Sequence, residues 1–429
     1  FTGKKLMSEK DLALNTRSSG GPLGRKYKVW EKIFVEKIKS IRNGRLILST
    51  ESEDYEFGRT QDGFPDAKIR VLDPIFFRKA CLGGSLGVAD SYSNGDWASE
   101  DLVTVFRLFL KNIDCLDGIE GGFAFLFNKL SRLAYKLLNK NTIKGSHRNI
   151  SLHYDLGNDF YELMLDPTMT YSCGIFESEK TTLQEAQEAK YDAIIDKLEL
   201  KPEHKVLEIG TGWGGFAVRA AKQCGCRVTT TTISKMQFEY AANRVQSSDL
   251  KDRITLLNSD YRHLKDKFDR VVSIEMIEAV GHEYLPKFFG KISDLLEQNG
   301  AALIQGITMP DHCYAKYLRE VDYVRTRVFP GSCVPSASAM IAASVKASDL
   351  RPVSLRDFGY HYSRTLREWR LRFKQNEEKI NSLGYDDAFR RAWEYYLCYC
   401  EAGFEEGYTG DVHLLLTKPE CKLARGFPR

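Results

Sequence analysis

No two cysteines in this 429-residue chain have the C-x-x-C spacing of a zinc or redox site, although it contains ten of them. The eight histidines form no H-E-x-x-H motif, so no structural metal is expected. Scattered cysteines of this kind indicate a reduced, intracellular environment. No apolar run reaches the roughly 18 residues of a membrane span, and the first residues lack a signal-peptide pattern. The sequence therefore predicts a cytoplasmic protein.

The charge of the chain is modest overall but uneven. The net charge is +4, and we expect no nucleic-acid partner. Residues 4–45, however, hold twelve lysines and arginines against four acids. Such an excess suits peripheral contact with an anionic phospholipid surface, and a flexible leader followed by a solvated face is the alternative. The chain opens on Phe1 rather than methionine, and we expect it to be a portion of a longer polypeptide.

Patterning divides the chain into four segments. Residues 1–24 are polar and rich in glycine and serine, and are predicted to be a flexible leader. Residues 25–122 are predicted to form a small α+β domain, with a hairpin at 46–49 and 54–58, a third strand, a helix stopped by glycines, and a last helix capped by Ser99. Residues 123–150 predict a basic amphipathic linker helix, which would lie at a membrane interface or pack on a neighbouring domain.

Residues 151–429 alternate short apolar strands with helices. The predicted strands are 206–209, 227–234, 254–261, 270–274 and 301–308, with a closing strand at 411–417 that carries Val412, Leu414 and Leu416 on one face. This alternation predicts an α/β fold with a doubly wound, Rossmann-like sheet.

The most informative stretch is KVLEIGTGWGGFA, residues 205–217, in which a buried strand turns through glycines into a helix. Such a turn lets a ligand approach the backbone beside a helix N-terminus. The E-x-G-x-G-x-G spacing indicates S-adenosylmethionine rather than a dinucleotide. Gly210, Gly212 and Gly215 also satisfy G-x-G-x-x-G, so the glycines alone do not decide between the two cofactors.

Further segments resemble the cyclopropane-fatty-acyl-phospholipid synthases. They are HYDLGNDFYELMLDPTMTYSCGIF (residues 153–176), VLEIGTGWGG, TTISKMQ, SDYRHL, SIEMIEAVGHEYLPKFF and RVFPGSCVPS. The resemblance runs from about Pro74 onward, and SIEMIEAVGHEY is similar to the plant branch, where the synthase follows an oxidase-like domain. It implies a class I methyltransferase sheet of seven strands with an antiparallel closing strand, helical insertions that cover the substrate, and a lipid-carrier-like N-terminal domain. It also implies a homodimer that adds a methylene across the cis double bond of phospholipid acyl chains.

The resemblance implies a cofactor site as well. The glycines would face the methionine part of S-adenosylmethionine, polar side chains after the second strand would bind the ribose, and Asp260 would accept from the adenine amine. A sulfonium beside the Tyr171 ring would gain cation–π attraction. The implied residues are Tyr171, Ser172, Gly210, Gly212, Gly214, Thr232, Ile233, Gln237, Asp260 and Tyr261.

For catalysis, the resemblance implies a bound bicarbonate ion as the base, held by Cys173, Glu278, Tyr396 and Gln305. Glu278 and Gln305 follow predicted strands, at the sheet edge where such folds bind ligands. Bacterial members have histidine in place of Gln305, and an amide can hydrogen-bond an anion but cannot carry charge. Glu278 is expected to orient the ion, and Glu275 is the alternative acid if the strand end lies elsewhere.

Two other functions stay open. One is an amine N-methyltransferase of the coclaurine or phosphobase type, against which stand the long N-terminal domain and Ala279, where those enzymes tend to have histidine. The other is a catalytically inactive protein that binds lipid and cofactor, which is considered because Gln305 replaces the histidine of the bacterial members. Methyl-branched or methylene products are also compatible with the same alkene chemistry.

Overall fold

The computed structural model describes residues 22–113, 156–320 and 322–423, which fall into two compact units. The first unit comprises the described residues up to 113 together with Tyr385–Ala402, and the second comprises the rest. The predicted leader, apart from its last residues, and the predicted linker helix at 123–150 lie outside the described residues.

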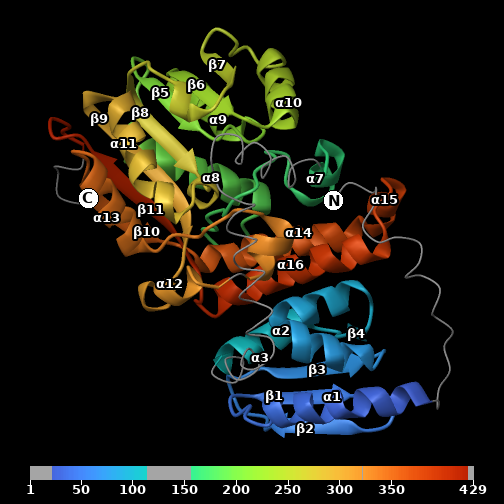
Figure 1. The fold of residues 1–429 in the computed structure, drawn as a ribbon. Helices are drawn as coiled ribbons and strands as arrows, with labels where there is room; N and C mark the ends of the chain where they lie inside the picture. The colour runs from blue at the N-terminus through green and yellow to red at the C-terminus, as the bar shows by residue number, and fades with distance from the viewer. Residues whose placement is uncertain (1–21, 114–155, 321, 424–429) are drawn as a thin grey trace. The chain divides into compact units, whose positions relative to one another are not determined.

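The first unit is built on a four-stranded sheet with the order β2-β1-β3-β4 (Figure 1). Its elements are α1 (Pro22–Ile38), β1 (Arg45–Ser49), β2 (Asp54–Gly58), β3 (Asp66–Val71), α2 (Ile75–Ser93), β4 (Trp97–Ala98) and α3 (Leu102–Lys111). The predicted hairpin is confirmed, since β1 and β2 pair antiparallel from Arg45–Gly58 to Ser49–Asp54. Phe34 of α1 packs edge-on against Phe76 and Phe77 of α2, with ring centroids 5.1 and 5.7 Å apart.

Two details of this unit differ from the sequence prediction. The glycines in α2 break the helix without ending it: Gly84 has φ +55°, and helical structure then resumes to Ser93. The N-cap of α3 is Asp101 rather than Ser99, because its side chain accepts the backbone N–H of Thr104 at 3.1 Å. Ser99 comes too early to cap the helix, since it directly follows β4.

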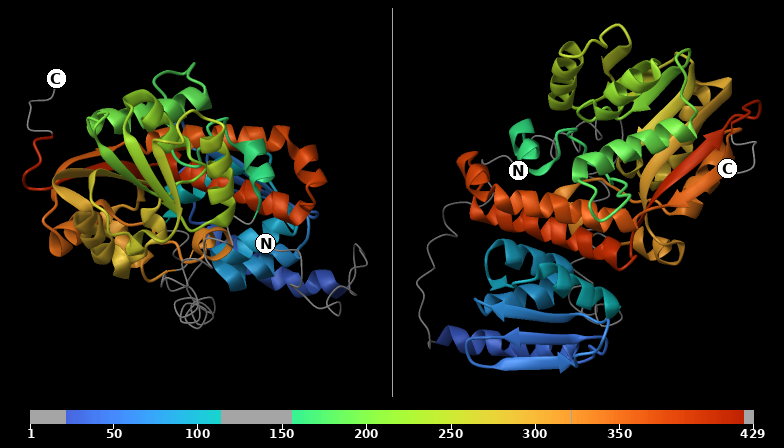
Figure 2. Two further views of the ribbon diagram at one scale, coloured as in Figure 1. Left: turned by 90° about the horizontal axis from the view of Figure 1, so that it is seen from above. Right: turned by 180° about the vertical axis from the view of Figure 1, so that it is seen from behind.

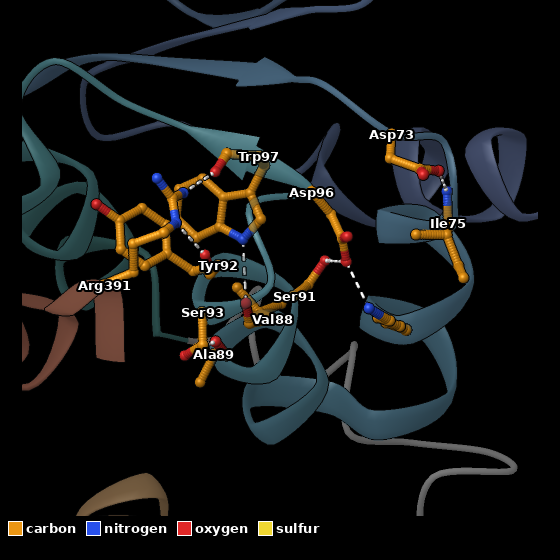
Figure 3. A network of polar contacts seen from close by, with 11 residues as sticks. Asp73, Ile75, Val88, Ala89, Ser91, Tyr92, Ser93, Asp96, Trp97 and Arg391 are labelled. Carbon is orange, nitrogen blue, oxygen red and sulfur yellow. Dashed lines mark hydrogen bonds and ion pairs between the residues drawn. The ribbon is translucent and has the colours of Figure 1, made fainter. Parts of the chain in front are cut away.

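The C-terminal part of the first unit belongs to α16 (Asp387–Glu405) and is tied to the turn between α2 and β4 (Figure 3). The Arg391 guanidinium donates to the carbonyls of Tyr92 and Trp97, both at 2.6 Å. It also lies 4.2 Å from the centroid of the Tyr92 ring, whose hydroxyl donates to Glu394 at 3.0 Å. Residues nearly 300 positions apart in the sequence are thereby held together by charge-assisted hydrogen bonds.

The second unit is organised around a seven-stranded sheet with the order β10-β11-β9-β8-β5-β6-β7. The strands are β5 (Lys205–Ile209), β6 (Arg227–Thr232), β7 (Ile254–Asn258), β8 (Phe268–Ile274), β9 (Leu296–Thr308), β10 (Arg351–Asp357) and β11 (Gly410–Thr417). Strands β5 to β9 are parallel neighbours, and β11 runs antiparallel to β9. The predicted doubly wound sheet with an antiparallel closing strand is therefore confirmed.

Helices cover both faces of this sheet (Figure 2). One face packs against α11 (Leu285–Leu295) and α13 (Ala337–Ala347) and includes Val412, Leu414 and Leu416, as predicted. The other packs against α8 (Leu183–Lys197) and α9 (Gly215–Cys224) and includes Val206, Val272 and Leu415. Strand β10 was not predicted, because all of its residues are exposed and its sequence, RPVSLRD, has no apolar run. A proline is tolerated there because β10 is an edge strand.

The remaining elements of the second unit connect the strands. The α-helices are α7 (Asn158–Met164), α8 (Leu183–Lys197), α9 (Gly215–Cys224), α10 (Lys235–Gln246), α11 (Leu285–Leu295), α12 (Asp311–Tyr317), α13 (Ala337–Ala347), α14 (Tyr360–Gln375) and α15 (Glu377–Ser382). Short 3-10 turns lie at Tyr261–His263, Ile277–Ala279 and His282–Tyr284, and a π-type turn at Val324–Val328. Nowhere in the described ranges is a helix both long and apolar enough to cross a bilayer.

Candidate active site

The turn between β5 and α9 leaves its backbone open to a ligand. Gly210, Gly212 and Gly214 have φ values of +98°, +51° and +84°, which other residues adopt only with strain. A Cβ atom placed on Gly212 would meet nothing within 4 Å, so the backbone at this point faces open space. The turn therefore fits the close approach of a cofactor beside the start of α9.

The buried carboxyl group of Glu208 stabilises this turn. Glu208 of β5 accepts the Thr230 hydroxyl at 2.6 Å, and Thr230 and Thr211 share a hydrogen bond at 2.7 Å. Burial raises the pKa of Glu208 to about 8, partly offset by the Thr230 bond. Glu208, the acid of the E-x-G-x-G-x-G motif, thus connects β5 to β6 and, through Thr211, to the glycine turn.

The side chains expected to hold the nucleoside part lie after β6 and β7. Thr232 donates its hydroxyl to the Gln237 carbonyl oxygen at 3.0 Å, so the Gln237 amide NH₂ faces away from this bond. Ile233 follows directly in the same connection. Arg262 donates to both carboxylate oxygens of Asp260 at 2.9 and 2.6 Å. These bonds keep the pKa of Asp260 below its usual value although burial alone would raise it. Tyr261 is partly buried. An ionised Asp260 remains able to accept from an amine.

The segment before α8 is anchored from two sides. The Ser172 hydroxyl accepts the Lys190 ammonium at 2.5 Å, and its carbonyl accepts the Gln187 amide at 2.8 Å. The ring of Tyr171 lies 4.9 Å from Trp369 and 5.4 Å from Tyr161. Aromatic faces of this kind are suited to a neighbouring positive charge.

Replacing Gly212 by alanine should weaken cofactor binding about tenfold or more, equivalent to about 1.4 kcal/mol. The new methyl group would enter the space that the ligand occupies, and the positive φ would add strain. Gly407→Ala is the matched control, because Gly407 has φ +65°, also faces open space and is exposed. Calorimetric titration with S-adenosylhomocysteine should separate the two variants. Equal affinities in both would remove the glycine turn from the cofactor site.

Beside the turn, Glu275 gathers hydrogen bonds from three distant segments. It is the first residue after β8 and has φ +47°, which is unusual for a residue with a side chain. Its Oε1 accepts the backbone N–H of Cys173 at 2.8 Å and the Gln305 amide at 2.9 Å. Its Oε2 accepts the Tyr362 hydroxyl at 2.6 Å. Backbone strain held in place by such a network is typical of a functional position.

Gln305 connects Glu275 to the closing strand. Its NH₂ group also donates to Asp411 at 2.8 Å, and its carbonyl oxygen pairs with His413 at 3.2 Å. The other ring nitrogen of His413 lies 2.9 Å from the Lys197 ammonium. Burial and Lys197 lower the pKa of His413 well below its usual value, so the imidazole is neutral. A neutral imidazole that accepts from Lys197 donates to Gln305, which fixes the orientation of the amide.

Glu278, three residues after Glu275, is held differently. Its Oε1 accepts the backbone N–H of Ile307 at 2.6 Å, whereas its buried Oε2 has no hydrogen-bond partner in the described part of the chain. Burial and the neighbouring charge of Glu275 raise the pKa of Glu278 to about 8. An unpaired buried carboxyl oxygen is costly, so it indicates a group that meets a ligand.

The electrostatics of this cluster follow from burial. Burial raises the pKa of Glu275, and burial together with the other two carboxyls raises that of Asp411 well above its usual value. Lys190 is buried too, and desolvation lowers its pKa to about 8 against the attraction of the acids. The pKa of the Cys173 thiol is raised well above its usual value by burial and the nearby acids. The thiol therefore stays protonated, and Cys173 offers its backbone N–H rather than a nucleophile.

The acids and the glycine turn are direct neighbours. A Cβ atom on Gly210 would lie 3.4 Å from the side chain of Met276, the residue between Glu275 and the turn that carries Glu278. Tyr362 stacks on Phe404 at 4.2 Å and lies 6.1 Å from Trp369, which also contacts Tyr171. The arrangement places carboxyl groups and aromatic rings together at one edge of the cofactor loop.

The structure brings together some of the residues that were singled out from the sequence. Cys173 and Gln305 meet at Glu275, and Glu278 contacts the same strand two residues further on, at Ile307. Tyr396 lies in the first unit, where its ring is 5.2 Å from Trp393. The Tyr362 hydroxyl, in the second unit, reaches Glu275.

Four residues of this network were not singled out from the sequence: Lys190, Tyr362, Asp411 and His413. A signal existed for two of them, because Asp411 and His413 are alternate polar residues in an otherwise apolar strand and so share one face. No comparable pattern marks Lys190 within its helix.

Comparisons with known proteins agree with this geometry. The model of the mycolic acid cyclopropane synthetase family matches residues 141–414. Tuberculostearic acid methyltransferase UfaA1 of Mycobacterium tuberculosis is 36% identical over 332 residues, which is 76% of this chain and 77% of that protein. Cyclopropane-fatty-acyl-phospholipid synthase of Escherichia coli is 34% identical over 345 residues, 80% of this chain and 86% of that one.

Among solved structures, mycolic acid cyclopropane synthase CmaA1 complexed with SAH and CTAB is 31% identical, with a TM-score of 0.59 over 63% of this chain and 98% of that one. Its sheet has the class I methyltransferase fold expected here. The family match covers more than half of the chain, and two relatives exceed 30% identity over most of it. The chain therefore belongs to the mycolic acid cyclopropane synthetase family and is an S-adenosylmethionine-dependent methyltransferase.

Proposed function

We propose that the protein converts the cis double bond of an unsaturated phospholipid acyl chain into a cyclopropane ring. The observation that carries this proposal is the contact between the glycine turn and the acid cluster, through Gly210 and Met276. A methyltransferase that acts on an amine, hydroxyl or thiol must remove one acidic proton. Three carboxyl groups and an aromatic wall beside the cofactor loop instead suit a reaction that passes through a carbocation.

The chemistry sets the roles. S-adenosylmethionine supplies an electrophilic methyl group on a sulfonium. An isolated alkene is a weak nucleophile, so the site must hold it in line and exclude water. The rings of Tyr171 and Trp369 and the negative charge of Glu278 stabilise the cation that the alkene becomes. A proton must then leave the new methyl group for the ring to close, which requires a base in the same site.

Access to the substrate requires contact with a membrane surface, and α1 is suited to it. Val29 and Ile33 are 61% and 38% exposed, one helical turn apart. Lys28 and Lys32 precede them and are also exposed. Apolar side chains flanked by lysines on an exposed helix favour the interface of an anionic bilayer. The homodimer implied by the resemblance stays a prediction.

Mass spectrometry of fatty acids tests the proposed function. The protein is incubated with S-adenosylmethionine and vesicles of monounsaturated phospholipid, and we expect a gain of one methylene group with loss of the double bond. A gain of one methylene group with a double bond retained would indicate a methylene-branched product, which a separate reductase would have to convert into a methyl branch. The name of the relative UfaA1, a tuberculostearic acid methyltransferase, makes this outcome a specific alternative. No gain in any lipid, with cofactor bound, would refute the proposal.

A further inference from the structure

Glu275 already accepts hydrogen bonds from donors that were expected to hold a bicarbonate ion. Two of the predicted ligands, the Cys173 backbone N–H and the Gln305 amide, donate to Oε1 of Glu275 at 2.8 and 2.9 Å. The Tyr362 hydroxyl donates to Oε2 at 2.6 Å. A carboxylate and a bicarbonate present similar planar pairs of oxygen atoms. An external ion would have to displace Glu275 from all three donors, so the residues present do not fit it.

Charge also opposes an additional anion. Burial raises the pKa of Glu275, Glu278 and Asp411, and the charge of Glu275 raises it further in the other two. The Lys190 ammonium offsets part of this effect on Glu275 and Asp411. The Gln305 amide bridges the Glu275 and Asp411 carboxyls, at 2.9 and 2.8 Å. Neighbouring carboxyls disfavour each other's negative charge, so each holds its proton to a higher pH. A bicarbonate ion would add a further negative charge beside them.

We propose that the Glu275 carboxylate, linked to Asp411 through the Gln305 amide, replaces bicarbonate as the base that removes the proton from the methylated acyl chain. The inference rests on the proposed function. In this step the C–H bond of the new methyl group breaks, and its electron pair forms the second carbon–carbon bond of the ring. The proton passes to Glu275, and the pair returns it to solvent before the next turnover. Products are the cyclopropane and S-adenosylhomocysteine.

This assignment explains the glutamine at position 305. Its NH₂ group has two hydrogens, one for Glu275 at 2.9 Å and one for Asp411 at 2.8 Å. An imidazole at the same place has a single N–H on that side and could serve only one of the two carboxyls. Gln305 therefore holds Glu275 and Asp411 in place together, and its hydrogen bond with His413 fixes the orientation of the amide.

The backbone supports the same conclusion. Glu275 holds φ +47°, a conformation in which glycine would be free of strain. A carboxylate is kept at this strained position by donors from Cys173, Gln305 and Tyr362. Glu275→Gly thus removes the carboxylate and relaxes the backbone together, which leaves the donors unpaired and open to an external anion.

The test compares wild type, Glu275→Gly and Glu275→Gln in buffer freed of carbon dioxide, with and without millimolar bicarbonate. Wild-type turnover should change by less than about twofold on adding bicarbonate. Glu275→Gly should lose about 10²- to 10⁴-fold without it, the usual contribution of a general base, and recover about tenfold or more with it. Glu275→Gln fills the space and sets an NH₂ against the donors, so bicarbonate should not rescue it. Thermal melts should show both variants folded.

A second readout does not depend on turnover. Line broadening of [¹³C]bicarbonate in the NMR spectrum should show binding to cofactor-loaded Glu275→Gly and none to wild type. Bicarbonate binding or bicarbonate-dependent turnover in wild type would overturn the inference, as would full activity of Glu275→Gly without bicarbonate. If wild type forms no lipid product, but bicarbonate binds Glu275→Gly and not wild type, the proposed function fails while the conclusion that Glu275 occupies the bicarbonate site stands.

Discussion

Replacing Glu278 by glutamine is expected to lower turnover about 10²- to 10³-fold while leaving cofactor affinity unchanged. Glutamine keeps the size of the side chain and an oxygen for the Ile307 N–H, which glutamate accepts at 2.6 Å. It removes the charge carried by the second oxygen, which is buried without a partner in the described residues. Only the cation formed during the reaction needs that charge, so the effect should appear in kcat.

The dependence of wild-type turnover on pH should reflect the ionisation of Glu278. The pKa of Glu278 is raised to about 8, so its anionic form gains population as pH rises through that value, and turnover should rise with it. Glu283→Gln is the control, because Glu283 is exposed in the same connection and should leave kcat unaltered. Calorimetry with S-adenosylhomocysteine and initial rates from vesicle assays supply the two quantities. Unchanged turnover in Glu278→Gln would remove Glu278 from the mechanism.

The second large effect concerns stability. Lys190→Met should lower the free energy of unfolding by about 3 to 5 kcal/mol near pH 7.5, the usual cost of leaving buried charge uncompensated. The ammonium donates to Ser172 at 2.5 Å, and its charge offsets Glu275 and Asp411. The melting temperature should fall by about 6 to 20 °C, at roughly 2 to 4 °C for each kcal/mol.

The loss of unfolding free energy in Lys190→Met should become smaller toward pH 5. The direction of this change follows from the raised pKa values of Glu275 and Asp411. Glu275 and Asp411 bind protons in the folded state at pH values where the unfolded chain has released them. Their neutral forms contribute fully below the unfolded pKa, and this stability is lost as pH rises through the folded values. Without Lys190 the folded values rise further, so the variant should lose more with rising pH. Lys205→Met, at an exposed lysine, should stay within about 0.5 kcal/mol. An equal loss at both pH values would indicate packing rather than charge.

The strands and the cofactor turn could be predicted from the sequence because their signals are local. Apolar runs of four to eight residues ending in glycines determine β5 and the turn without reference to distant residues. The hairpin of β1 and β2 followed from alternation of the same kind. The edge strand β10 carries no such signal, since its pairing with β11 rather than its own burial makes it a strand.

The acid site could be predicted only in part, because its meaning depends on contacts between distant segments. Glu275 was the alternative to Glu278, and its position after β8 did not reveal that Cys173, 102 residues earlier, donates to it. Tyr362 reaches it from 87 residues later. Hydrogen bonds at these separations leave no periodicity in the sequence. The departure at Gln305 was visible, whereas its cause required the position of Asp411.

The pairing of β11 with β9 also sets when the site can exist. Gln305 lies opposite His413 in this ladder, and a slip of one residue would turn Asp411 and His413 to the other face of the sheet. Asp411 joins Gln305 across 106 positions of chain, a contact formed only after the intervening helices are in place. While the chain is being synthesised, the glycine turn can therefore form well before the acid pair. A nascent chain that ends before β11 has the cofactor loop but lacks Asp411 and His413, the two partners of Gln305 on that strand.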